Sequence, residues 1–353
     1  MLAYDADLEL FRDNFKRFMS EQIAPHYDQW EREGIMPRSV WSSLGENGFL
    51  CVDVPEEYGG YGVPTHYSLM LVEESARAGY CALSTAISCH SEIAAPYIQH
   101  IGTEEQKQYW LPKMVSGEVV GAIGMTEPGA GSDLQAMRTN AILQDDHYVL
   151  NGSKTFISNG QHADVVVLAV KTDPQARAKG VSLLLVDTHL EGFKKGTNLD
   201  KIGLHSQDTS ELFFDNVKVP KDQLLGKAGS GFAYLMQELP RERTAIAATS
   251  LGAIRGSIDL ATAYVKERQA FGQAIAIRDS SKDRIGVATS TFFGFLDLGV
   301  GGGPIVLGAI IPMLGNGMLG FRNLYLYSAP AVVIVWIIYY LIHGKHQKSS
   351  SKV

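Results

Sequence analysis

The sequence predicts a multi-domain α+β protein built from four consecutive segments. These are an N-terminal all-α domain at 1–118, a middle antiparallel β-barrel domain at 119–226, a truncated C-terminal helical domain at 227–277, and a transmembrane-like helical hairpin at 278–353. Three observations predict this order. Apolar residues first recur at helical spacing, short β-rich runs between turns follow, and charge is almost absent beyond Arg284. The 353 residues allow two or three domains with a large core.

Composition excludes several classes of function. Hydrophobic residues make up 45% and charged residues 20%, which is ordinary for a globular protein. The net charge of −7 argues against a general nucleic-acid binder. Three cysteines without CxxC spacing predict neither a disulfide framework nor a metal site, and they favour a reducing compartment: Cys51, Cys81 and Cys89. The first residues lack the basic and apolar regions of a secretory signal.

The first segment shows the periodicity of buried helices. One apolar stripe has three- and four-residue spacing: Leu8, Phe11, Phe15 and Phe18. Further helices are expected at 67–78 and 92–101, and Thr103 is a plausible N-cap for another. A turn-rich stretch interrupts them at 58–62.

The middle segment has the texture of a small β-domain. Its short β-rich runs are 148–150, 165–170, 181–186, 212–214 and 217–219. Turns such as Asn151-Gly152 separate them, which predicts antiparallel pairing. Helix is expected again at 232–239 and, after Pro240, over an amphipathic run at 242–268.

Two charge-free runs follow, 298–321 and 323–342, each long enough to cross a bilayer as a helix. Lysine or arginine flanks both outer ends, so the positive-inside rule predicts a hairpin with both ends in the cytoplasm. A buried pair of helices in a soluble protein is the alternative.

The loop at 124–133, Gly-Met-Thr-Glu-Pro-Gly-Ala-Gly-Ser-Asp, is the strongest candidate for ligand binding. Glycine lets the backbone approach a ligand closely, and successive amides can converge on an anion or a polar heterocycle. An ordinary turn is the alternative for this loop taken alone.

In this order the motifs resemble those of the acyl-CoA dehydrogenase family, up to about Ile277. The matching stretches are 54–60, the 124–133 loop, 154–159, 208–214 and 268–272. The subgroup is similar to the long-chain and isovaleryl type. The resemblance implies an α-helical domain, a β-domain and a C-terminal four-helix domain, with FAD between the last two.

The resemblance also implies a flavin site and a reaction. FAD would be lined by Ile123, Gly124, Met125, Thr126, Gly131, Ser132, Phe156, Ile157 and Ser158. Ser132 would also face the acyl-CoA. Hydroxyl donors at Thr126 and Ser158 suit the negative charge of a reduced flavin, with turn capping as their alternative role.

The family reaction removes an α-proton from a thioester while a β-hydride leaves for flavin N5. Glu242, in the segment Leu-Pro-Arg-Glu-Arg, matches the base position of the long-chain and isovaleryl type. Burial would raise the pKa of such a carboxylate and make it a better base. By its place alone it could be an ordinary first-turn glutamate. Substrate contacts are expected from Pro240, Arg241 and Arg243, the last as a ligand of CoA or an orienter of Glu242.

Partners follow from the same resemblance. Arg268 resembles the arginine that reaches the FAD pyrophosphate of a neighbouring subunit, which implies a homo-oligomer, a tetramer in the family; a solvated helix charge is its alternative. Electron-transferring flavoprotein is the expected electron acceptor.

Beyond Ile277 the sequence departs from the family, and residues from about Lys282 resemble the last two helices of a major-facilitator drug-efflux transporter. We therefore expect a cytoplasmic catalytic part tethered to the cell membrane. Without its bundle partners, the apolar face at 251–264 would be unburied. Two other functions stay open: an inactive truncated dehydrogenase fused to a membrane hairpin, and a transporter fragment.

Overall fold

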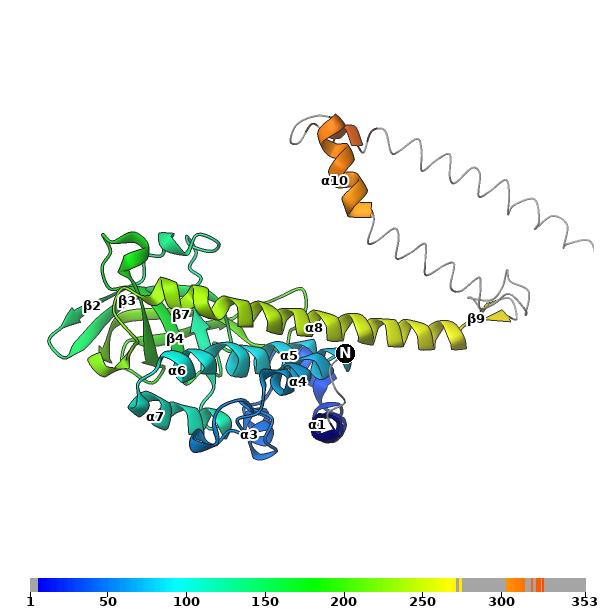
Figure 1. Cartoon of the computed structure of the whole chain (residues 1–353), viewed down its shortest axis with the longest axis horizontal. Coiled ribbons are helices and arrows are strands. Elements are labelled where there is room, and N and C mark those ends of the chain that lie inside the picture. Colours follow the sequence, from blue (N-terminus) through cyan, green and yellow to red (C-terminus); the bar gives the residue numbers. More distant parts are fainter. Residues whose placement is uncertain are drawn as a thin grey trace, which may run out of the picture. The chain divides into compact units, whose positions relative to one another are not determined.

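The computed structural model describes residues 6–270, 273–274, 303–314, 319, 322–324 and 326. The chain divides into two units, 1–261 and 262–353, and each is considered by itself. The first unit contains the helices and the eight-stranded sheet that surround the candidate site (Figure 1).

Short helices build the N-terminal part of the first unit. The α-helices are α1 Ala6–Phe18, α2 Tyr27–Glu33, α3 Ser39–Glu46, α4 Thr65–Arg77, α5 Cys81–Ile87, α6 Ala95–Ile101 and α7 Glu104–Val115. Two π-helical turns, η1 Met19–Ile23 and η3 Ser88–Ala94, and one 3₁₀ turn, η2 Glu56–Tyr58, lie between them. The predicted N-cap is confirmed. The Thr103 hydroxyl accepts a hydrogen bond from the Gln106 backbone amide, and the Gln106 side-chain oxygen accepts one from the Thr103 backbone amide.

The strands that follow form the sheet, and short 3₁₀ turns connect some of them. The strands are β1 Gly121–Gly124, β2 Asn140–Gln144, β3 His147–Ser158, β4 Val165–Lys171, β5 Val181–Asp187, β6 Phe193–Asn198, β7 Thr209–Pro220 and β8 Leu224–Leu225. The turns are η4 Leu134–Ala136, η5 Arg177–Gly180 and η6 Lys221–Gln223. The order of the strands in the sheet is β6-β7-β3-β2-β4-β5-β8, with β1 paired to β4.

The predicted all-antiparallel arrangement is wrong at β4, which has two parallel pairings. β1 pairs with β4 in parallel, from Gly121 opposite Val165 to Gly124 opposite Leu168, and β2 joins β4 in parallel at one pair. Parallel neighbours need a crossover connection, and the β2–β3 hairpin lies in the chain between β1 and β4. The two runs expected at 212–214 and 217–219 belong to one bulged strand, β7.

The core lies in layers on both faces of the sheet. Alternate residues of β4 point in opposite directions, as the pleat requires. Val165, Val167 and Ala169 pack against α6 and α7, and Val166, Leu168 and Val170 pack against β3, β5 and β7. Both faces of β4 are therefore covered, which explains its continuous apolar sequence.

The long helix α8, Gly231–Glu267, runs from the sheet along α5 and α4 (Figure 1). The two helical runs expected at 232–239 and 242–268 form one helix, which continues through Pro240 and packs on one stripe before and after the proline. The buried stripe is Gly231, Leu235, Glu238, Glu242, Ala245, Gly252 and Gly256. It carries glutamates and glycines, whereas Leu251, Ile254 and Ile258 lie exposed.

The described part of the second unit is small. It holds the end of α8 from Thr262, two short paired strands, β9 Gln269–Ala270 and β10 Gln273–Ala274, and the helix α10 Gly303–Leu314. Most of the expected membrane hairpin lies outside the described residues. Within them, every helix is too short or too polar to cross a bilayer.

Candidate active site

A cavity of about 340 Å³ lies where α5, η3, β1, β3 and α8 meet. Its lining brings together residues far apart in the chain: Thr85, Ser88, Cys89, Ile93, Ile123, Met125, Thr126, Phe156, Ile157, Ser158, Ile246, Thr249 and Ser250. Six of the residues predicted to hold a cofactor are among them. The lining combines apolar side chains with hydroxyl groups, which suits a flat heterocycle with polar edges.

The loop after β1 is held in place by a buried ion pair. Lys154 Nζ, on β3, donates to Glu127 Oε1 at 2.8 Å and to the Met125 carbonyl at 3.0 Å. Glu127 also accepts from the backbone amides of Arg138 and Thr139. The pair therefore fixes the backbone that places Met125 and its neighbours at the cavity.

The β3 side of the cavity has an unusual backbone. Phe156 has φ of +58°, a left-handed conformation that is strained for a bulky residue, and it lies at a register shift between Lys154 and Ile157. Its ring is 67% exposed, whereas Ile157 beside it is buried. The shift turns three consecutive residues, 156–158, toward the cavity instead of alternating ones.

The glycines of the 124–133 loop differ in what they do. Gly124 lies in β1, where a Cβ would come within 2.6 Å of Leu168 Cδ1, so strand packing explains this glycine. Gly131 has open space around it, and it lies exposed with Ser132 at the far end of the loop. None of these three residues lines the cavity described above.

Glu242 is a buried carboxylate close to the cavity. Its Oε1 accepts a hydrogen bond of 2.7 Å from the hydroxyl of Tyr97, on α6. Burial raises its pKa, and the nearby charge of Glu238 adds to this, whereas Tyr97 and Arg243 lower it. Burial also raises the pKa of the Cys89 thiol to about 12, with a smaller contribution from the charge of Glu242. The carboxylate thus lies near a residue that lines the cavity.

The three residues on α8 that were predicted to contact the substrate lie in different surroundings. Arg241 Nη2 binds Asp53 Oδ2 at 2.6 Å and Glu92 Oε2 at 3.0 Å, in a largely buried cluster. Both bonds hold the guanidinium of Arg241 within this cluster. The substrate role of Arg241 stays a prediction. Arg243 and Pro240 are exposed on α8.

Comparison with known proteins identifies the family. Models of the acyl-CoA dehydrogenase N-terminal, middle and C-terminal domains match residues 5–118, 122–217 and 229–289. Isovaleryl-CoA dehydrogenase of Solanum tuberosum is 37% identical over 276 residues, which cover 78% of this chain and 67% of that protein. The chain belongs to the acyl-CoA dehydrogenase family.

Other members of the family also match and show how much of their length the chain covers. The long-chain specific acyl-CoA dehydrogenase of Sus scrofa is 42% identical over 275 residues, which cover 77% of this chain but only 64% of that protein. An acyl-CoA dehydrogenase structure from Geobacillus kaustophilus shares 46% identity with a TM-score of 0.77 and covers 82% of this chain and 76% of its own. A structure described as the electron transferring flavoprotein of Acidaminococcus fermentans matches at 36% identity and a TM-score of 0.77, over 81% of this chain and 75% of that one.

Sequence reasoning about this family member missed the side of the cavity formed by helices. Thr85, Ser88, Cys89 and Ile93 lie in α5 and η3, where a π-helical turn changes the spacing that a helical periodicity would follow. A widened turn in an otherwise apolar helix leaves no distinct sequence signal. Arg268 lies exposed directly after α8, in the second unit, and its role stays a prediction.

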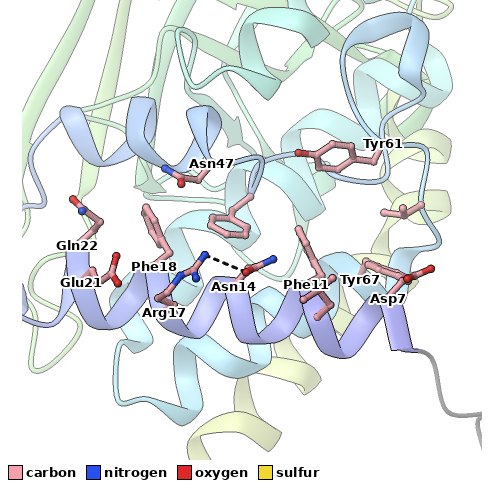
Figure 2. Close-up of a pocket in the computed structure, with 13 residues that line it drawn as sticks. Asp7, Phe11, Asn14, Arg17, Phe18, Glu21, Gln22, Asn47, Tyr61 and Tyr67 are labelled. Carbon is pink, nitrogen blue, oxygen red and sulfur yellow. Dashed lines mark hydrogen bonds between the residues drawn. The ribbon is translucent and has the colours of Figure 1, made fainter.

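A larger cavity of about 700 Å³ lies elsewhere in this family member, along α1 (Figure 2). Aromatic side chains including Phe11, Phe18 and Tyr61 line it, with Arg17 bonded to Asn14 at its edge. It shares no lining residue with the cavity at Cys89 and contains none of the predicted site residues. Size alone therefore does not mark the candidate active site.

Proposed function

We propose that the chain is an FAD-dependent acyl-CoA dehydrogenase that oxidises a fatty or branched acyl-CoA thioester, with Glu242 as its base. One observation carries the proposal: a buried carboxylate lies beside the cavity lined by six residues that the family resemblance assigns to the flavin. The curated relatives named above are long-chain and isovaleryl enzymes. Acyl chain length is left open by this proposal.

The residues at the cavity fit FAD. Ile123, Met125 and Ile157 offer apolar surfaces for a planar ring, and the hydroxyls of Thr126 and Ser158 offer donors for its polar edge. When bound, FAD supplies the acceptor for the hydride that leaves the β-carbon of the substrate. Gly124, Gly131 and Ser132 remain proposed cofactor or substrate contacts, as does Arg268.

Glu242 would take the α-proton. The carboxylate must be ionised to act as a base, and a raised pKa brings its basicity closer to that of a thioester α-carbon. Burial of Glu242 limits the access of water that would otherwise solvate the carboxylate. Arg243 lies exposed one residue further along α8, and we propose that it binds the anionic CoA portion. Pro240, also exposed, remains a proposed substrate contact.

The test is reduction of bound flavin by acyl-CoA without oxygen. The purified full chain should carry FAD, and its absorbance near 450 nm should bleach when a medium- or long-chain acyl-CoA is added. Glu242→Gln should retain FAD and slow bleaching by about 10²- to 10⁴-fold, the usual loss for a general base. Bleaching at the parental rate would remove Glu242 from the mechanism, and a colourless parent would contradict the proposed function.

A second candidate is an inactive protein that keeps the dehydrogenase fold but does not catalyse the reaction. The exposure of Leu251, Ile254 and Ile258 on α8 favours it, because an uncovered apolar face is unusual beside a finished cofactor site. This candidate predicts substoichiometric FAD. One FAD per chain after gel filtration would exclude it.

We further propose electron-transferring flavoprotein as the acceptor, a homo-oligomer as the assembly, and a membrane hairpin at 278–353 as a tether for a cytoplasmic catalytic part. The apolar composition of the two runs at 298–321 and 323–342 supports the hairpin. Fractionation of expressing cells tests it. Release of the full chain by high salt or carbonate without detergent would contradict the tether.

A further inference from the structure

Glu242 is one of two glutamates on the buried stripe of α8, and each is bonded to a residue of α6. Tyr97 donates to Glu242 at 2.7 Å, and His100 Nδ1 lies 2.9 Å from Glu238 Oε1. Glu238 and Glu242 are four residues apart, and Tyr97 and His100 are three apart, so each pair lies on one helix face. Two bonds in succession therefore fix the register of α8 against α6 where the candidate base lies.

The Tyr97 ring cannot move easily. It is fully buried and packs in the apolar cluster that contains Ile98, Trp110 and Leu111. Among the described residues its hydroxyl makes one hydrogen bond, the one to Glu242. A ring held by packing defines the position of its hydroxyl, and the hydroxyl then defines the rotamer of the carboxylate.

As a result, the two carboxylate oxygens of Glu242 differ in their hydrogen bonding. Oε1 is occupied by the tyrosine, and within the described part of the chain no residue donates a hydrogen bond to Oε2. We propose that Tyr97 is the positioning residue of the candidate base: its buried hydroxyl holds Oε1 of Glu242 and leaves Oε2 to take the α-proton. This inference rests on the proposed function of Glu242.

The charge of the carboxylate gives the contact a second effect. A hydroxyl that donates to a carboxylate stabilises the ionised form. The other ionisable groups that act on Glu242 are Glu238 and Arg243, on α8, and Cys89, on η3. Burial keeps the pKa of Tyr97 well above its usual range, so the phenol stays protonated and remains a donor at every working pH.

The test is Tyr97→Phe, which removes the hydroxyl and keeps the ring. Without the donor, the pKa of Glu242 should rise, so the acid limb of the pH profile of kcat/KM should move up by about one pH unit. The free energy of a charge-assisted hydrogen bond corresponds to a pKa shift of roughly that size. KM should change little, because Tyr97 does not line the cavity. The matched control is Tyr58→Phe, whose hydroxyl also binds a carboxylate, Glu104 at 3.0 Å, on α7.

A second measurement needs neither FAD nor substrate. In full-length apoprotein labelled with ¹³C at the glutamate δ-carboxyl, the Glu242 signal is assigned by its loss in Glu242→Gln. Its titration midpoint should rise in Tyr97→Phe and stay unchanged in Tyr58→Phe. An unchanged midpoint, or a parental kcat/KM profile in a Tyr97→Phe enzyme that binds FAD, overturns the inference. A parent that does not bleach contradicts the proposed function instead, and the titration still decides whether Tyr97 controls Glu242.

Discussion

Glu92 shows how one buried residue can make stability depend on pH. Its carboxyl lies fully inside the protein, shares Arg241 with Asp53, and leaves Oε1 without a partner among the described residues. Burial raises its pKa to about 7; Asp53 adds to this, and Arg241 offsets only part of it. The folded-state pKa is above the unfolded value, so the stabilising contribution is complete below about pH 4 and is lost as pH rises through about 7.

The change Glu92→Gln should remove this dependence. Between pH 4 and pH 8, we expect the titration of Glu92 to lower the free energy of unfolding of the parent by up to about 3 kcal/mol. The variant should not show this decrease. Urea unfolding at several pH values measures both. Glu191→Gln, at an exposed position, is the control and should follow the parent. If the free energy of unfolding had the same pH dependence in Glu92→Gln and in the parent, Glu92 would not be the group responsible.

At Lys154 the residue-scale prediction concerns the candidate flavin loop. Lys154→Met leaves the buried Glu127 carboxylate without its cation and should lower the free energy of unfolding by about 3–5 kcal/mol. Glu127→Gln added to Lys154→Met removes the stranded charge while keeping an acceptor for the Arg138 and Thr139 amides, and it should recover part of the loss. Thermal unfolding measures this, with exposed Lys218→Met as control. A double variant no more stable than Lys154→Met would show that the charge is not the cause.

At the scale of elements, α8 depends on close approach to α4. A Cβ on Gly252 would lie 2.1 Å from the Glu73 carbonyl oxygen, and one on Gly256 would lie 2.2 Å from that of Arg77. Alanine is the better helix former by about 1 kcal/mol, so intrinsic propensity alone predicts stabilisation. We expect the opposite for Gly252→Ala, a loss of about 1–3 kcal/mol in urea unfolding, because backbone must shift. Ser257→Ala, exposed on the same helix, should be neutral or slightly stabilising.

Local signals determined how much of these elements the sequence could predict. The Thr103 cap and the β4 and β5 runs depend on neighbours in the chain, and the structure confirms them. The continuity of α8 through Pro240 was missed because tertiary packing on both sides of the proline decides it. The bond from Tyr97 to Glu242 spans 145 residues, and the binding of Arg241 to Asp53 spans 188, so no local pattern contains them. A family motif could point to Glu242, but its contact with Tyr97 could be seen only in the fold.

At the scale of the whole molecule, the outer face of α8 decides how the chain behaves in solution. Leu251, Ile254 and Ile258 follow one another at three- and four-residue spacing, away from the stripe of Gly252 and Gly256, and their side chains are 42%, 57% and 56% exposed. Full burial of such side chains is worth roughly 1.5–3 kcal/mol each, which is enough to drive contact between copies.

The double change Ile254→Gln and Ile258→Gln should therefore weaken self-association of the full chain by at least about tenfold, since roughly 1.4 kcal/mol already corresponds to that factor. Light scattering after gel filtration, over a range of protein concentrations, measures it. Glutamine keeps the helical propensity high, so the helix should persist. Ile202→Gln, at a fully exposed isoleucine outside α8, tests whether any loss of apolar surface has the same effect. Equal behaviour of the two variants would show that the α8 face is not the contact. An association that is weakened only by the α8 change would place the contact on the helix that carries Glu242, so assembly and the candidate base would share one element.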